Sequence, residues 1–167
     1  MKKFLLAVML GVFATSAIPL QLQAEWVEER TDLAIECLAK NIYFESRGSN
    51  LADMAAVANV VMNRTKDRRY PNTICGVVHQ GKKDASGNMI KNLCQFSWYC
   101  DGKPDTPTNE DAWNKAQLLA YQMVEQGKYR GLTEGATHYH ATYVKPIWAK
   151  DFTLIGRIGE HIFYRWE

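Results

Sequence analysis

Glu45 is the first residue of the sequence whose surroundings suggest acid–base chemistry. It follows Tyr43 and Phe44, and Gly48 comes shortly after it. A carboxyl beside aromatic rings loses hydration, which raises its pKa and lets it act as a general acid near neutral pH. A nearby glycine leaves room for a substrate to approach. The plain alternative is a solvated carboxylate paired with Arg47, because most carboxylates are exposed.

Two histidines separated by one residue, His138 and His140, are the second candidate. If they lie on a strand, their side chains point to the same face of a sheet. Such a pair could bind zinc with His79 or His161 as a third ligand, or it could line a groove. The sequence lacks the His-Glu-x-x-His motif, so it favours the groove, and we expect neither a metal nor another cofactor.

Aromatic and amide side chains form a third group. Gln95, Phe96 and Ser97 are consecutive, and Trp148 follows the histidine pair. Rings that stack on sugars, with amides and hydroxyls between them, would form a glycan groove, although the same rings could instead fill a core. The sequence contains no nucleophile elbow, P-loop or dinucleotide-binding motif, which disfavours those enzyme classes.

The N-terminus has the pattern of a secretory signal peptide. Two lysines precede an apolar run over residues 4–18, which is shorter than the roughly 20 residues of a membrane span. We expect cleavage after Ala24, with Ala17 as the alternative site and an uncleaved anchor as the alternative interpretation. The chain then divides into a signal peptide, 1–24, and one domain, 25–167, exported to the periplasm or the medium.

The charge and the cysteines of this domain exclude some partners. Of 20 Lys+Arg and 18 Asp+Glu in the chain, the signal peptide holds two lysines, so the domain has no net charge and nucleic acid is not an expected partner. We expect a monomer with no membrane contact after cleavage. Four cysteines in an exported domain predict two disulfides, and all three pairings remain open. They are Cys37, Cys75, Cys94 and Cys100.

Two helices are predicted to position Glu45. The first begins with Thr31 as its N-cap and ends near Gly48, which places Glu45 in its last turn. The second covers residues 51–64, capped by Asn50 or the serine before it. Because it is apolar on almost every side, we expect it to be the core helix.

The rest of the chain alternates between loops and short elements. Residues 74–79 form a strand or a helical turn, and residues 80–109 are a long loop, rich in Gly and Pro. A capping box from Thr108 to Asp111 then begins a third helix, which ends near Gly127.

Short strands are predicted towards the C-terminus, over residues 137–144, 152–155 and 158–164, because these segments are aromatic and β-branched. Helices first and strands late predict an α+β domain with a small C-terminal antiparallel sheet.

Six segments of the sequence occur in an order that matches a known family. AKNIYFESRG contains Glu45 and AAVANVVMNR ends at Arg64; YPNTICGVVHQ, QFS, HYHA with PIW, and IGEHIF follow. Together they resemble the SleB/CwlJ-type cell-wall hydrolases over residues 33–165. Two positions depart from the family pattern: Ser46 stands where Ala is usual, and Ser49 stands where Glu is usual.

The resemblance implies a lysozyme-like α+β catalytic domain that cleaves peptidoglycan, with the glycan strands as its partner. The catalytic glutamate of the family corresponds to Glu45, and members of known type are lytic transglycosylases that leave 1,6-anhydro-muramic ends. The expected substrate-binding residues are Gln95, Phe96, Ser97, His138, His140 and Trp148.

Three alternatives to a transglycosylase remain open. A muramidase that uses water would need a second carboxylate, for which Asp101, Asp105 and Asp151 are the candidates. A zinc-dependent amidase would use the histidines. A wall-binding module would have no catalytic activity.

Overall fold

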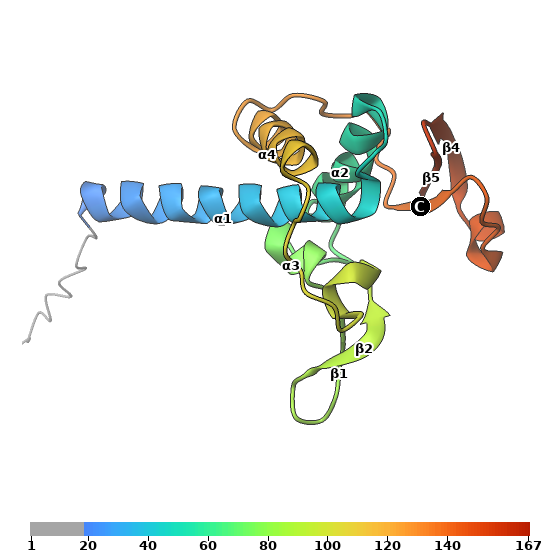
Figure 1. The fold of residues 1–167 in the computed structure, drawn as a ribbon, viewed down its shortest axis with the longest axis horizontal. Coiled ribbons are helices and arrows are strands. Elements are labelled where there is room, and N and C mark those ends of the chain that lie inside the picture. Colours follow the sequence, from blue (N-terminus) through green and yellow to red (C-terminus); the bar gives the residue numbers. More distant parts are fainter. Residues whose placement is uncertain (1–18) are drawn as a thin grey trace, which may run out of the picture.

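The long first helix sets the axis of the molecule. The structure, a computed structural model, describes residues 19–167, so most of the predicted signal peptide lies outside the described residues. Helix α1 (Leu20–Ser46) runs along the longest dimension (Figure 1). The predicted start at Thr31 is wrong, because neither Gly nor Pro interrupts the chain between Pro19 and Ser46. The helix therefore continues through the predicted cleavage site at Ala24, and cleavage itself stays a prediction.

The C-terminal end of α1 lies where the sequence predicted it. The backbone N–H of Arg47 donates to the Tyr43 carbonyl at 3.2 Å. Gly48 then adopts a φ of +91°, a conformation that most side chains disfavour. Glu45 is thus in the last turn of the helix, as predicted. Within residues 19–167 no helix has the length and hydrophobicity that crossing a bilayer requires.

Helix α2 (Leu51–Arg64) confirms the predicted core helix. Its N-cap is Asn50, whose side-chain oxygen accepts a hydrogen bond from the Asp53 N–H at 3.0 Å. Most of its residues are buried, and α1, α3 and α4 share the main hydrophobic cluster with it.

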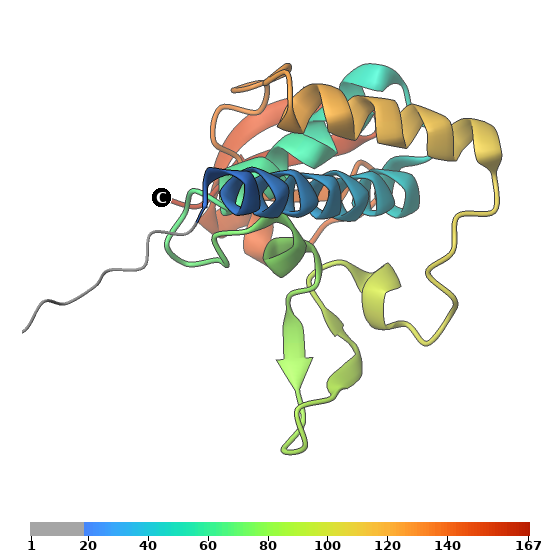
Figure 2. The ribbon, with the colours of Figure 1, turned by 90° about the vertical axis from the view of Figure 1, so that its left-hand side faces the viewer.

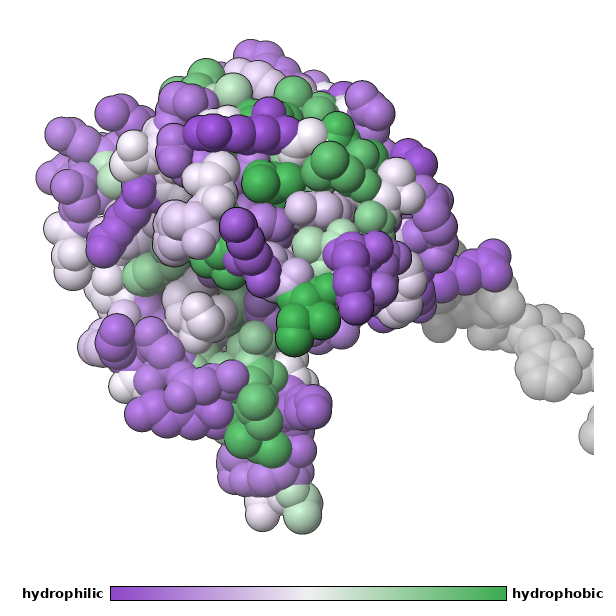
Figure 3. All heavy atoms as spheres, turned by 90° about the vertical axis from the view of Figure 1, so that its right-hand side faces the viewer, coloured by the Kyte–Doolittle hydropathy of each residue, from purple (hydrophilic) through white to green (hydrophobic). Residues whose placement is uncertain are grey.

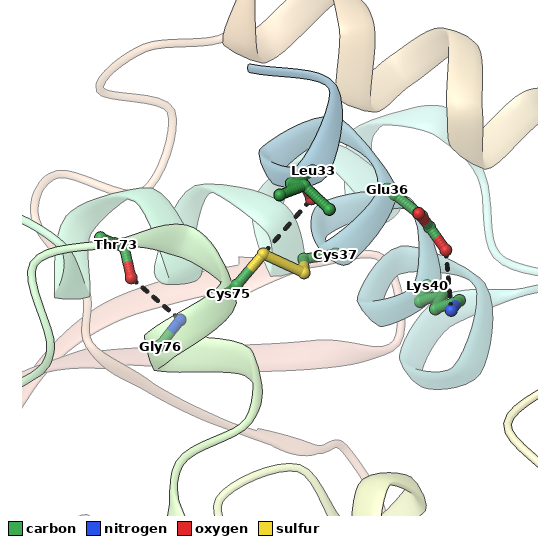
Figure 4. The surroundings of a disulfide bond; sticks show 7 residues. All are labelled: Leu33, Glu36, Cys37, Lys40, Thr73, Cys75 and Gly76. Atoms are coloured by element: carbon green, nitrogen blue, oxygen red, sulfur yellow. Dashed lines mark hydrogen bonds and ion pairs between the residues drawn. A yellow bond between two sulfur atoms is a disulfide. The ribbon is translucent and has the colours of Figure 1, made fainter. Parts of the chain in front are cut away.

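The short helix α3 (Ile74–Val78) is fastened to α1. The Thr73 side chain caps it by accepting from the Gly76 N–H at 3.1 Å. A disulfide between Cys37 and Cys75 links the two helices covalently (Figure 4).

A β-hairpin occupies the first half of the predicted loop 80–109. Strands β1 (Gly81–Lys83) and β2 (Met89–Cys94) pair antiparallel and project away from the helices (Figure 2). The loop prediction was wrong because the tip is organised locally: Asp84 Oδ1 accepts from the N–H groups of Ser86 and Asn88, both at 2.9 Å.

A second disulfide, Cys94–Cys100, joins the end of this hairpin to the 3-10 helix η1 (Ser97–Cys100). Helix α4 (Glu110–Val124) packs along α1 on the side opposite the hairpin (Figures 1 and 2). Its N-cap is Asn109, which accepts from the Ala112 N–H at 2.9 Å, and not the predicted Thr108.

The C-terminal part forms the predicted antiparallel sheet beyond the end of α1 (Figure 1). Strands β3 (His138–Ala141), β4 (Thr153–Ile158) and β5 (His161–Arg165) are arranged in the order β3-β5-β4, and the 3-10 helix η2 (Ile147–Asp151) lies between β3 and β4. The predicted boundary was shifted, since β4 continues to Ile158. The α+β class, with helices first and the sheet last, is confirmed.

Gly159 makes the turn between β4 and β5. Its φ is +56°, and a Cβ there would lie 2.5 Å from the Cβ of Asp53. The turn thus brings the sheet against the N-terminal part of α2, where the Asp53 carboxylate contacts His161 Nδ1 at 2.8 Å.

We expect the two disulfides to contribute unequally to stability. Cys37 and Cys75 are 38 residues apart, so replacing both by Ala should lower the unfolding free energy by about 4 kcal/mol. Cys94 and Cys100 are only 6 apart, and their replacement should cost about 2 kcal/mol. Urea unfolding of the two double variants measures the difference, and equal losses would contradict this prediction.

Candidate active site

Glu45 faces a small cavity at the point where five segments of the chain meet. The cavity has a volume of about 260 Å³. Its walls come from the ends of α1 and α2, the residues between β2 and η1, strand β3 and helix η2. The lining residues are Glu45, Arg64, Gln95, Phe96, His138, Tyr139 and Trp148.

The Glu45 carboxyl is partly buried and has one hydrogen-bond donor. The Tyr139 hydroxyl donates to Glu45 Oε2 at 2.9 Å. Burial raises the pKa of Glu45, and the Tyr139 hydrogen bond and electrostatic interactions with His161 and Arg64 oppose this without reversing it. Burial also raises the pKa of Tyr139 well above its usual value, so its hydroxyl stays a donor.

Tyr43 anchors the last turn of α1 on its other side. The ring is fully buried, and the hydroxyl oxygen accepts from the N–H groups of Thr108 and Asn109 at 3.0 and 3.1 Å and from Arg47 Nη1 at 2.9 Å. The hydrogen bonds from Thr108 and Asn109 lower its pKa to about 8. Arg47 thus bonds to Tyr43, so the plain alternative of a Glu45–Arg47 pair is not what the structure contains.

Strand β3 presents different groups on its two faces. His138 and His140 both lie against Trp148, with ring centroids 5.4 and 5.7 Å away, as the alternation of a strand predicts. Tyr139 lies between them in sequence and contacts His161, whose ring centroid is 5.2 Å away. The Nδ1 atom of His161 in turn contacts the Asp53 carboxylate at 2.8 Å.

The structure brings four of the six predicted substrate-binding residues to the cavity wall. These are Gln95, Phe96, His138 and Trp148. Ser97 is exposed and does not line the cavity. His140 lies one step farther along β3, where its Nε2 is 3.1 Å from the Tyr164 hydroxyl.

Two cavity residues were not among the predicted site residues. Tyr139 and Arg64 occur in the sequence motifs HYHA and AAVANVVMNR, but neither was assigned a role in the site. A stronger signal for Arg64 was available, since it is a cation at the end of a helix that is otherwise predicted to be buried.

The histidines needed for a zinc site are separated. His79 stacks on Tyr99 near the hairpin, with centroids 4.3 Å apart, and His161 lies on the other face of the sheet from His138 and His140. In the part of the chain that the structure describes, no three His, Cys, Asp or Glu side chains gather as metal ligands would.

Few ionisable side chains line the cavity. Burial and the charges of Arg64 and Arg69 lower the pKa of His138 to about 4, so this ring is neutral at pH 7. Glu45 is the one carboxyl among the lining residues, and Arg64 is the one permanent cation.

The cavity lies beside the hairpin, which stands apart from the rest of the molecule. The hairpin forms a lobe below the body, and hydrophobic and hydrophilic residues alternate on this side of the molecule (Figure 3). Gln95 and Phe96 come from the base of that lobe, and His138 and Trp148 come from the C-terminal sheet region. The cavity therefore lies between the hairpin base and the sheet.

Comparison with known proteins identifies the family. Residues 48–164 match the family model described as Cell Wall Hydrolase. The chain belongs to this cell wall hydrolase family. The matched region begins just after Glu45, so the role of this residue must be argued from the site.

Named relatives and solved structures agree with this family. The chain is 30% identical over 132 residues to two curated proteins from Bacillus cereus, each named spore cortex-lytic enzyme. The aligned region covers 77% of this chain but 43% of each relative, so the chain spans less than half the length of the curated relatives it matches.

Two solved structures share the fold. The catalytic domain of the Bacillus cereus SleB protein aligns with a TM-score of 0.58 and 25% identity, over 80% of this chain and 91% of that one. The catalytic domain of the germination-specific lytic transglycosylase SleB from Bacillus anthracis aligns with a TM-score of 0.58 and 28% identity, over 79% and 93%.

We expect the protonation of Glu45 to affect the stability of this protein. Because folding raises its pKa, the folded state holds this proton more tightly than the unfolded state. This contribution is complete below the ordinary pKa of Glu and is lost as pH rises through the raised pKa. In the unaltered protein, the urea concentration at the midpoint of unfolding should therefore decline as pH rises from the ordinary pKa of Glu through the raised pKa of Glu45. Glu45→Gln should remove this decline, whereas the control Glu29→Gln, at an exposed position, should keep it. A decline of equal size in Glu45→Gln would contradict the assignment.

Proposed function

We propose that this cell wall hydrolase cleaves the glycan strands of peptidoglycan, with Glu45 as its catalytic acid. The observation that carries the proposal is a partly buried carboxyl, with its pKa raised by burial, facing a cavity with aromatic, amide and cationic walls. Peptidoglycan lies outside the cytoplasmic membrane, so we place the enzyme in the periplasm or beyond the cell.

The first step is protonation of the leaving group. Glu45 in its neutral form donates a proton to the glycosidic oxygen between N-acetylmuramic acid and N-acetylglucosamine. The bond from C1 of the muramic residue to that oxygen breaks, and an oxocarbenium-like centre forms at C1. Tyr139 holds the carboxyl in place through Oε2, which leaves the other carboxyl oxygen free to face the substrate.

The second step favours an intramolecular nucleophile. Glu45, now a carboxylate, takes the proton from the C6 hydroxyl of the same muramic residue, and the oxygen closes on C1 to form a 1,6-anhydro ring. This route needs one carboxyl, and Glu45 is the one carboxyl among the residues that line the cavity. The similar Bacillus anthracis protein is named a lytic transglycosylase, which is consistent with this route.

A muramidase that uses water is the alternative. It would normally use a second carboxylate within about 10 Å of the first. The sequence candidates Asp101, Asp105 and Asp151 are not among the cavity-lining residues. The single carboxyl therefore favours the anhydro route.

We expect Glu45→Gln to lower the rate of muropeptide release from purified sacculi by about 100- to 10,000-fold, because a general acid contributes that much. The protein should still fold, since Gln has the same shape. In the unaltered protein, mass spectrometry should detect products lighter by one water than hydrolytic muropeptides. Full activity of folded Glu45→Gln would overturn the catalytic role, and products of full hydrolytic mass would favour the muramidase.

Tyr139→Phe should move the alkaline limb of the pH profile. The Tyr139 hydroxyl lowers the pKa of Glu45, so its loss should raise that pKa further and keep the acid protonated to higher pH. The alkaline limb of the pH profile of kcat/KM should shift to higher pH. Tyr164→Phe is the control, because that hydroxyl contacts His140 and not Glu45. A limb that stays fixed, or moves downward, would contradict the role given to Tyr139.

A further inference from the structure

Arg64 is a buried cation at the wall of the cavity with part of its bonding capacity unused. Its side chain is 5% exposed, and its Nε donates to the Thr137 carbonyl at 2.8 Å. The guanidinium lies over the rings of Tyr70 and Phe96, 5.0 and 5.4 Å from their centroids. These contacts fix its position without neutralising its charge.

The second observation is an orphaned donor. Within residues 19–167, Arg64 Nη1 is buried without any hydrogen-bond partner, and no ion pair joins Arg64 to a carboxylate. Leaving a buried donor unpaired costs free energy, and more so when the group is charged. Arg64 lines the cavity, so an anionic ligand that approached its guanidinium from there would offset part of this cost.

The electrostatics of the cavity indicate the sign of that ligand. When Glu45 is protonated, as the proposed first step requires, its carboxyl is neutral, and His138 is also neutral at pH 7. Arg64 then leaves one uncompensated positive charge on the wall. An anionic oxygen fits this cavity better than a neutral one.

We propose that Arg64 recognises the lactyl carboxylate of the muramic residue whose glycosidic bond is cleaved. This inference rests on the proposed function. The lactyl group is attached at C3 of the same sugar ring that reacts at C1, so it lies close enough to share a small cavity with the Glu45 carboxyl. The carboxylates of a stem peptide are farther along the substrate.

The proposal makes Arg64 a determinant of specificity. The lactyl group is a free carboxylate on a peptide-free strand, and it is a neutral amide where a stem peptide is attached. A charge-assisted hydrogen bond is roughly twice as strong as a neutral one. The enzyme should therefore prefer peptide-free strands, and a reaction that hydrolyses the lactyl–peptide amide would supply its substrate.

The test measures binding, with catalysis removed. In the Glu45→Gln protein, calorimetry compares two ligands: peptide-free glycan strands, and the same strands with their lactyl carboxylates converted to amides. We expect the carboxylate strands to bind about tenfold more tightly. Adding Arg64→Gln should reduce this ratio to about one. The exposed Arg130→Gln, which does not line the cavity, should leave it unchanged.

Each result decides a different point. Equal binding of both strands to the Glu45→Gln protein would overturn the proposal for Arg64 and leave the proposed function standing. Persistence of the tenfold ratio after Arg64→Gln would also overturn it. Failure to bind either strand would overturn the proposed function together with this inference. The two-ligand comparison needs no change at Arg64, so it decides the proposal even if Arg64→Gln does not fold. Strands that carry stem peptides serve as a third ligand. If they bind as tightly as peptide-free strands, Arg64 recognises a carboxylate of the peptide, and the assignment to the lactyl group is overturned.

Discussion

The removal of the Glu45 carboxyl from water is the constraint on which the rest of the site depends. Burial raises the pKa of this carboxyl and so favours its neutral form, whereas full exposure to water would favour the ionised form. The Tyr139 hydroxyl and the charge of Arg64 counteract part of the burial. The result is a carboxyl that can hold a proton and also release it, as an acid that later acts as a base must do.

Separate anchors fix three of the parts of the chain that surround the cavity. The last turn of α1 is fixed by the hydrogen bonds on the Tyr43 oxygen, the hairpin base by the Cys94–Cys100 disulfide, and the sheet by the contact between Asp53 and His161. Each anchor lies outside the cavity. The cavity wall is therefore free to carry polar groups, such as Arg64 Nη1, that are poor choices for stability alone.

The sequence predicted the helices whose ends are set by a cap or a glycine within a few residues. Gly48 and Asn50 gave the end of α1 and the whole of α2, because a positive φ and a cap act within a few residues. The hairpin was missed, since its tip depends on the specific bonds of Asp84 in a segment rich in turn residues. The contact of Tyr139 with Glu45 joins residues 94 apart, and no local pattern could indicate it.

The strand order β3-β5-β4 has a consequence for the timing of assembly. Strand β3, which carries Tyr139, pairs with β5, and β5 is made last of the three. Among the described residues, β3 pairs with no strand other than β5, so Tyr139 gains its neighbouring strand only when residues 161–165 have joined the sheet. A folding chain that has not yet placed these residues holds the Glu45 carboxyl without the strand that supports its hydrogen-bond donor. The topology therefore makes completion of the site depend on the last strand of the sheet.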